Sequence, residues 1–123
     1  MLFTTIGESC MAFSRGDVVL VPFPFTDLSA TRVRPAVVVS SPAYEEDTGD
    51  IILTMVTSQR HDGRTDFALQ DWQQAGLVRP SWVRVKLATL DSRLVQFSPG
   101  RLSDRDALSV AGNIHMVLGW EGV

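Results

Sequence analysis

Residues 32–40 read Arg32-Val33-Arg34-Pro35-Ala36-Val37-Val38-Val39-Ser40, two arginines at the entrance to a short apolar run. A proline disfavours helical backbone at the residue before it, so Arg34 is expected to be extended and to begin a strand. A guanidinium is always charged and carries five donors, so it is costly to leave at the mouth of a buried strand without a partner. The segment therefore predicts a buried strand over residues 36–40, with a cationic group at its entrance that a phosphate would satisfy.

Further strand patterns surround this segment. Residues 17–23 and 51–57 are mostly apolar and rich in β-branched side chains, and residues 81–87 alternate between polar and apolar positions. These patterns predict three more strands, the last of them half-buried. Weaker signals predict short strands at 66–69 and 94–97, loops at 24–33, 41–49 and 59–65, and a turn at 71–76.

The end of the chain carries the clearest helical pattern. Ser103 is a suitable N-cap, and Asp106 stands three residues on, as in an acidic variant of the capping box. Apolar residues then recur at helical spacing from Ala107 to Leu118. Many short strands closed by one C-terminal helix predict the α+β class, mostly β, in the form of a small SH3-like barrel.

Length and composition indicate one globular domain. The chain has 123 residues, of which 45% are hydrophobic and 20% charged, and it has a single cysteine. One cysteine excludes an internal disulfide framework, so the reducing cytoplasm is the simplest location. No apolar run approaches the roughly 18 residues of a membrane span, so no membrane partner is expected.

The first residues differ from the rest of the chain. They lack the basic segment of a signal peptide, and Met11 begins a stretch that would make a natural start. We interpret residues 1–12 as an extension outside the core fold, which need not be ordered, and residues 13–123 as the domain. The alternative is an ordered segment that packs on the domain.

The charge distribution is more informative than the net charge of −3, which argues against a general nucleic-acid-coating protein. Residues 31–41 and 79–90 hold basic side chains and no acidic ones, whereas residues 44–50 hold four acids and no base. An acidic protein can still present a local basic cleft that concentrates anions. The acidic run lacks the spacing of an EF-hand loop, so neither a metal nor a cofactor is expected.

Few residues suggest chemistry by pattern alone. His61 lies in a polar loop and His115 in the predicted helix, so a histidine acid–base pair is poorly supported. Thr57 and Ser58 end a predicted strand, where a hydroxyl could position a phosphate or could simply end the strand. Trp82, Arg84 and Lys86 share one face of the alternating strand, either as a surface that stacks a base and follows phosphates or as a solvated sheet face.

Three blocks in this order and spacing resemble the MazF/PemK toxins of type II toxin–antitoxin systems. They are Arg15-Gly16-Asp17-Val18-Val19-Leu20-Val21, Arg34-Pro35-Ala36-Val37-Val38-Val39-Ser40 and Val56-Thr57-Ser58-Gln59. Residues 81–86, Leu102-Ser103 and the terminal helix also fit. The resemblance implies a homodimeric, metal-independent endoribonuclease that cuts single-stranded RNA at short sequences and is silenced by a cognate antitoxin.

The same resemblance implies roles for individual residues. Arg34 matches the catalytic arginine of the family, and Thr57 matches its catalytic threonine. The remaining candidates are expected to bind RNA: Asp27, Arg32, Ser58, Gln59, Arg60, Trp82, Arg84 and Lys86. The alternatives are a non-catalytic member of the same fold that binds nucleic acid or a protein, and an SH3-like module that recognises peptides.

Overall fold

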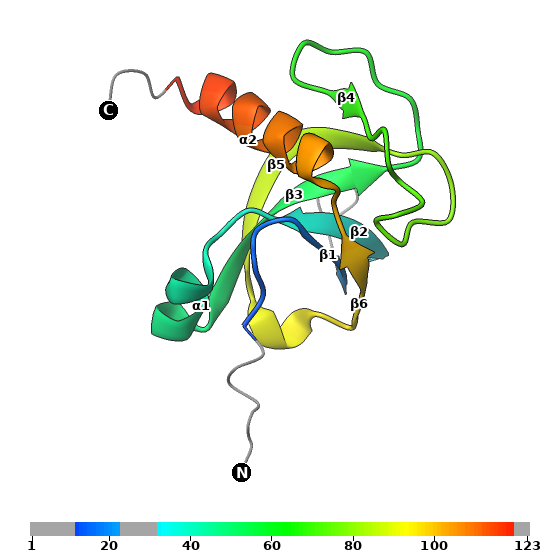
Figure 1. The fold of residues 1–123 in the computed structure, drawn as a ribbon. Helices are drawn as coiled ribbons and strands as arrows, with labels where there is room; N and C mark the ends of the chain where they lie inside the picture. The colour runs from blue at the N-terminus through cyan, green and yellow to red at the C-terminus, as the bar shows by residue number, and fades with distance from the viewer. Residues whose placement is uncertain (1–11, 23–31, 120–123) are drawn as a thin grey trace.

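A computed structural model describes residues 12–22 and 32–119. Six antiparallel strands, in the order β4-β5-β3-β2-β1-β6, curl into a half-barrel with the C-terminal helix across one face (Figure 1). This architecture confirms the predicted mostly-β class with a C-terminal helix. The elements in chain order are β1 (Asp17–Pro22), β2 (Val33–Val38), α1 (Pro42–Thr48), β3 (Asp50–Thr57), β4 (Phe67–Ala68), β5 (Trp82–Asp91), a 3-10 helix (Ser92–Leu94), β6 (Phe97–Arg101) and α2 (Asp104–Leu118).

Each face of the sheet carries a buried cluster, because successive side chains of a strand point to opposite sides. A helix-side cluster packs beneath α2 and contains Val18, Val37, Val56, Leu69, Ala75, Val83, Leu102 and Val110. A second cluster fills the other face with Val19, Val21, Ala36, Val38, Ile51, Leu53 and Met55. Phe13, near the start of the predicted domain, packs against this second cluster, whereas the predictions for residues 1–11 and for Phe23 lie outside the described residues.

The segment after β2 differs from the prediction. A polar loop was expected over residues 41–49, but residues Pro42–Thr48 form α1. The Ser41 hydroxyl accepts a hydrogen bond from the Tyr44 amide, Pro42 stands at the start of the helix, and Gly49 ends it with φ of 79°. These are ordinary start and stop signals for a helix. The sequence pattern predicted a loop because the helix is polar and has no buried residue, so it lacks an apolar periodicity.

Strand boundaries also shift. β2 begins at Val33 and ends at Val38, so Arg34 and Pro35 lie inside the strand and not before it. β5 continues to Asp91, and the predicted short strand at 94–97 is wrong, because residues Ser92–Leu94 form a 3-10 helix and β6 begins at Phe97. β6 is placed by its pairing with β1, which joins Leu20 to Phe97.

The C-terminal helix begins as predicted, with Ser103 as its N-cap. The Ser103 hydroxyl accepts a hydrogen bond from the Asp106 amide at 3.4 Å. The capping-box pattern predicted that the Asp106 carboxylate accepts a hydrogen bond from the backbone amide of the N-cap residue. The carboxylate instead accepts hydrogen bonds from the backbone amides of residues 70 and 71. Within the described part of the chain, no helix is both long enough and apolar enough to cross a membrane.

Candidate active site

Arg34 and Thr57 come from neighbouring strands of the sheet. β2 and β3 pair antiparallel, with Val38 opposite Leu53 and Ala36 opposite Met55, where the ladder ends. Continuing this register by two residues on each strand brings Arg34 opposite Thr57. Ala36 and Met55 both belong to the second cluster, so alternation places Arg34 and Thr57 on that same face of the sheet.

Pro35 explains why the ladder stops short of these two residues. Val39 donates its amide to the Ile52 carbonyl at 2.8 Å, and hydrogen-bonded pairs alternate along an antiparallel ladder. The next hydrogen-bonded positions of β2 are therefore residues 37 and 35. At residue 35, the backbone amide would donate to the Val56 carbonyl. Proline has no amide hydrogen, so this bond cannot form, and the ladder ends before it reaches Arg34.

Arg34 is half-buried in β2, next to β1, where its cross-strand partner is Val21. A surface ion pair with Asp17 or Asp27 is the structural alternative to a functional role for this arginine. Asp17 instead accepts hydrogen bonds from the Ser14 amide and the Arg101 guanidinium, and Asp27 lies outside the described residues. Among the residues that the structure describes, none forms an ion pair with Arg34.

Thr57 is buried at the end of β3, with 7% of its surface exposed. Its hydroxyl oxygen accepts a hydrogen bond from the Gln59 amide at 3.1 Å, which fixes the oxygen at the strand end. A threonine hydroxyl carries one donor and two acceptor lone pairs. The Thr57 hydroxyl can therefore still donate to a phosphate oxygen.

β5 extends the same face beyond β3. Trp82 pairs with Thr57 and Arg84 pairs with Met55, and both side chains are half-buried. The register then shifts, so that Leu87 pairs with Thr54 and the two residues between, Val85 and Lys86, have no partner in β3. Val85 and Lys86 therefore form a bulge, and because the bulge holds two residues, Arg84 before it and Ala88 after it both lie on the face of the second cluster.

The other predicted RNA-binding residues lie in exposed positions. Ser58, Gln59 and Arg60 follow β3 in an exposed loop, and the Arg60 guanidinium lies 3.1 Å from the Asp62 carboxylate. Arg32 is exposed just before β2, and Asp27 lies outside the described residues. His61 is half-buried in the loop after β3, whereas His115 lies in the last turn of α2.

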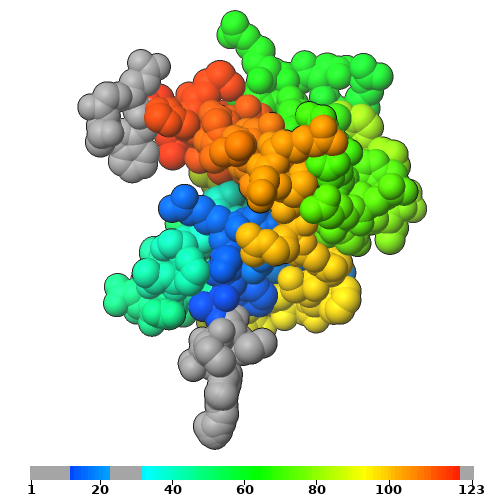
Figure 2. Space-filling view, viewed as in Figure 1, coloured from blue at the N-terminus to red at the C-terminus, as the bar shows by residue number. Residues whose placement is uncertain are grey.

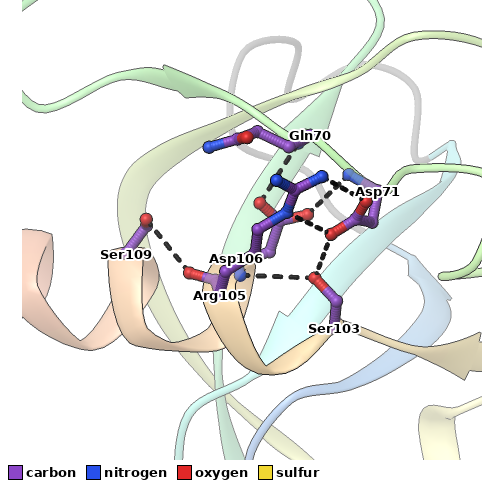
Figure 3. A network of polar contacts seen from close by, with 6 residues as sticks. All are labelled: Gln70, Asp71, Ser103, Arg105, Asp106 and Ser109. Atoms are coloured by element: carbon purple, nitrogen blue, oxygen red, sulfur yellow. Dashed lines mark hydrogen bonds and ion pairs between the residues drawn. The ribbon is translucent and has the colours of Figure 1, made fainter.

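A carboxylate network between the end of β4 and the start of α2 was not foreseen from the sequence (Figure 3). Asp106 is 1% exposed, and its two oxygens accept from the amides of Gln70 and Asp71 at 3.1 and 2.9 Å. Arg105 donates two hydrogen bonds, each of 2.7 Å, to the Asp71 carboxylate. These bonds anchor the turn at residues 70 and 71 to α2. The same turn leads into β5, which begins with Trp82, the partner of Thr57.

The Asp71 carboxylate is stabilised in its charged form. Its hydrogen bonds to Arg105, and to the Ser103 hydroxyl at 2.6 Å, lower the pKa of Asp71 to about 2. Arg93 similarly lowers the pKa of Asp91 to about 2, at the end of β5. Both effects follow from donors that favour the ionised carboxylate.

An apolar groove of about 980 Å³ lies between α2 and the part of the sheet that α2 does not cover. Val39, Ile52 and Leu87 line it from the sheet, and Leu108, Ala111 and Leu118 line it from the helix. The surface is hollowed below α2 in the space-filling view (Figure 2). Leu108 is 74% exposed, which is unusual for a leucine on a helix that also packs on the core.

Comparison with known proteins identifies the family. The family model described as PemK-like, MazF-like toxin of type II toxin–antitoxin system matches residues 14–118, so the chain belongs to this family. The resemblance of the three sequence blocks is thereby confirmed. A comparison with curated proteins found no match.

Solved structures share the fold. A mycobacterial endoribonuclease in complex with its cognate antitoxin gives a TM-score of 0.76 at 18% identity, covering 91% of this chain and 100% of that chain. A chain of the MazE–MazF complex (Form-III) from Deinococcus radiodurans gives 0.70 at 25% identity, covering 89% and 99%. The Mycobacterium tuberculosis toxin MazF-mt6 gives 0.69 at 13% identity, covering 85% and 98%. These similarities confirm the predicted MazF/PemK-like barrel with a C-terminal helix.

Proposed function

We propose that this chain is the toxin of a type II toxin–antitoxin system and acts as an endoribonuclease on single-stranded RNA, with Arg34 and Thr57 as catalytic residues. The observation that carries the proposal is the β2–β3 register, whose continuation sets a half-buried arginine and a threonine with a fixed hydroxyl oxygen on one face of the sheet. Membership of the PemK/MazF family and structural neighbours described as endoribonucleases support it.

The proposed reaction uses a nucleophile that the RNA itself supplies. The ribose 2′-oxygen forms a bond to the adjacent phosphorus, and the bond from phosphorus to the 5′-oxygen breaks. The 2′-hydroxyl gives its proton to water, and the departing 5′-oxygen takes one from Arg34, which water then reprotonates, so the products are a 2′,3′-cyclic phosphate and a 5′-hydroxyl. Because the nucleophile is already adjacent, the enzyme needs mainly to orient the phosphate and to stabilise its developing charge.

The two side chains suit these tasks. The Arg34 guanidinium can make two parallel hydrogen bonds to phosphate oxygens, and it can donate a proton to the leaving 5′-oxygen. A guanidinium carries its full set of protons and is a poor general base, so we assign Arg34 charge stabilisation. The Thr57 hydroxyl orients the phosphate or the 2′-hydroxyl. Since a fixed cation supplies the charge stabilisation, we propose that cleavage needs no metal ion.

The surrounding residues of the same face would bind the RNA. Trp82 offers a ring on which a base can stack, and Arg84 offers a guanidinium for a phosphate. We assign Arg32, Ser58, Gln59, Arg60 and Lys86 to the same surface, and we propose that Asp27 also binds RNA. Contacts of this kind to splayed bases would make cleavage sequence-specific. The substrate would be messenger RNA in the cytoplasm, so that cleavage inhibits translation and growth.

A cognate antitoxin is the proposed regulator. The mycobacterial and Deinococcus neighbours were solved with their antitoxins, and the present chain belongs to the same family. We propose that a flexible antitoxin segment covers the RNA-binding face. Growth arrest on expression of the chain, relieved by its antitoxin, is the expected cellular result.

A second copy of the chain is the proposed occupant of the apolar groove. The groove joins an exposed apolar helix face to an uncovered part of the sheet, as expected for a homodimer interface that is apolar at its centre. Leu108→Glu should shift the sedimentation of the protein from dimer to monomer. Val78→Glu, at an 87% exposed position away from the groove, should leave the dimer intact, and a monomeric wild type would contradict the assignment.

Incubation of the purified chain with a long single-stranded RNA in EDTA tests the proposed activity. Discrete cuts that leave 5′-hydroxyl and 2′,3′-cyclic phosphate ends are expected. RNA binding without cutting, by protein free of any antitoxin fragment, would favour a non-catalytic member of the fold.

A further inference from the structure

Asp66 is a buried carboxylate at the edge of the proposed active site. Its side chain is 6% exposed, and it lies just before β4, whose residue Phe67 pairs with Val83 of β5. Continuing that register by one residue brings Asp66 opposite Arg84. One carboxylate oxygen accepts from the Arg84 Nε at 3.2 Å, and the other accepts from the Gly63 amide at 3.1 Å.

The turn before β4 is shaped around this carboxylate. The Asp66 amide donates to the Gly63 carbonyl at 3.1 Å, which closes the turn. A Cβ atom at Gly63 would lie 2.7 Å from an Asp66 carboxylate oxygen, so a larger residue at this position would displace the Asp66 side chain. Asn113 of α2 holds the same turn by donating to the Thr65 carbonyl at 2.9 Å. The carboxylate is therefore fixed by its surroundings as well as by Arg84.

Hydrogen bonds hold Arg84 both at its backbone and at its guanidinium. Its carbonyl accepts a hydrogen bond from the hydroxyl of Thr54, which is fully buried, and its Nε donates to Asp66. Within residues 12–22 and 32–119, no protein group accepts a hydrogen bond from its two Nη atoms. The Arg84 side chain remains 30% exposed on the face that carries Thr57 and Trp82.

We propose that Asp66 is a positioning residue that fixes the Arg84 guanidinium so that its Nη groups bind an RNA phosphate next to the one that is cleaved. This inference rests on the proposed RNA-cleaving function. An arginine restrained through its Nε loses less conformational freedom on binding, and its remaining donors form the fork that matches a phosphate.

The direction in which Asp66→Asn changes the RNA affinity distinguishes a positioning role from simple electrostatics. Asp66 carries a negative charge beside an RNA surface, so electrostatics alone predicts that Asp66→Asn tightens RNA binding. Positioning predicts weaker binding, because Arg84 loses its restraint. Asp62→Asn is the matched control, since Asp62 lies in the same loop and pairs with a candidate RNA-binding arginine, Arg60, but is 73% exposed.

Binding is measured with an uncleavable 2′-O-methyl copy of the RNA, for wild type, Asp66→Asn, Arg84→Gln, the double variant and Asp62→Asn. We expect Asp66→Asn and Arg84→Gln each to raise the dissociation constant roughly threefold or more, without further loss in the double variant. Each should also reduce the slope of log affinity against log salt by up to about 0.7, the contribution of one phosphate contact to a single strand. Asp62→Asn should not weaken binding.

Equal or tighter binding by Asp66→Asn, or additive losses in the double variant, would overturn the inference. If Asp66→Asn fails to fold, Arg84→Lys is the variant to measure. Lysine keeps the positive charge but lacks the Nε atom that donates a hydrogen bond to Asp66, so wild-type RNA affinity of Arg84→Lys would also overturn the inference. RNA binding by a wild type that does not cut would refute the proposed cleavage alone. Absence of RNA binding would refute both.

Discussion

Arg34 and Thr57 lie on one face of the sheet, each two residues beyond the Ala36–Met55 pair at which the β2–β3 ladder ends. The ladder ends there because Pro35 lacks the amide hydrogen that the next bond needs. The dipeptide Arg34-Pro35 thus places an arginine in β2 and removes one hydrogen-bond donor from the β2–β3 ladder beside it. Because Pro35 determines where that ladder ends, we regard it as part of the candidate site.

Pro35→Ala tests this role of the proline. The new amide can donate to Val56, which would extend the β2–β3 ladder and draw Arg34 toward Thr57. We expect cleavage to fall roughly tenfold or more, because small displacements of catalytic groups are costly, while the unfolding temperature stays the same or rises. The measurement is the cleavage rate together with thermal unfolding. Pro42→Ala at the start of α1 is the control, and normal cleavage by Pro35→Ala would refute the role.

Thr57→Val removes the hydroxyl and keeps the shape of the side chain. We expect the cleavage rate to fall on the order of 100-fold, the usual effect of losing one donor to a developing negative charge. The loss of the Gln59 hydrogen bond should cost only about 1 kcal/mol of unfolding free energy. Thr57→Ser retains the hydroxyl and should cleave close to the wild-type rate. Equal cleavage by the valine variant would exclude a role for the hydroxyl.

Local sequence signals predicted much of the fold. The apolar runs of β1 and β3, the alternation at the start of β5 and the N-cap Ser103 depend on near neighbours, and all are present. Helix α1 also has local signals, Ser41-Pro42 and Gly49, but it buries no residue and therefore lacks the apolar periodicity that predicts a helix. The misplaced strand at 94–97 has another cause, because β6 is defined by pairing with β1 some eighty residues earlier.

Only part of the candidate site could be predicted from the sequence. Arg34 and Thr57 are candidates because of the strand patterns together with the family resemblance. Asp66 and Asp106 could not be predicted in this way, because Asp66 meets Arg84 across 18 residues and Asp106 meets Gln70 across 36. No spacing rule relates such contacts. The β5 bulge at Val85 and Lys86 is likewise set by pairing with β3.

Asp106 should be important for stability, because its buried carboxylate satisfies two backbone amides. Asp106→Ala leaves both amides without a partner, which should lower the unfolding free energy by about 3 kcal/mol. Asp104→Asn is the control, since Asp104 is exposed in the same first turn and loses only a helix-dipole interaction of about 0.5 kcal/mol. Chemical denaturation of the two variants provides the comparison, and equal small effects would show that the network is dispensable.

Asp71 predicts how stability depends on pH. Its pKa is lowered to about 2 in the folded protein, mainly by its hydrogen bonds to Arg105, from an ordinary value of 3.8. The unfolded chain therefore takes up the proton first as the pH falls, so this stabilisation is complete above about pH 4 and declines toward pH 2.

The difference in unfolding free energy between wild type and Asp71→Asn should accordingly shrink from pH 5 to pH 2, an interval chosen to span roughly both pKa values. Asp91 titrates in the same range, but it is present in both proteins and its contribution cancels. Denaturant titrations across this interval supply the values. A difference that stays constant, or that grows in acid, would contradict the assigned pKa.

The most direct test of the central claim is the rate at which Arg34→Ala cleaves a long single-stranded RNA in EDTA. Arg93→Ala, which removes an exposed arginine at the other end of β5, serves as the matched control. Our account predicts a loss of roughly 1,000-fold or more for Arg34→Ala, the usual effect of removing an arginine that stabilises a phosphoryl transition state, with wild-type folding and unimpaired cleavage by the control. Retained cleavage by folded Arg34→Ala protein would contradict the account.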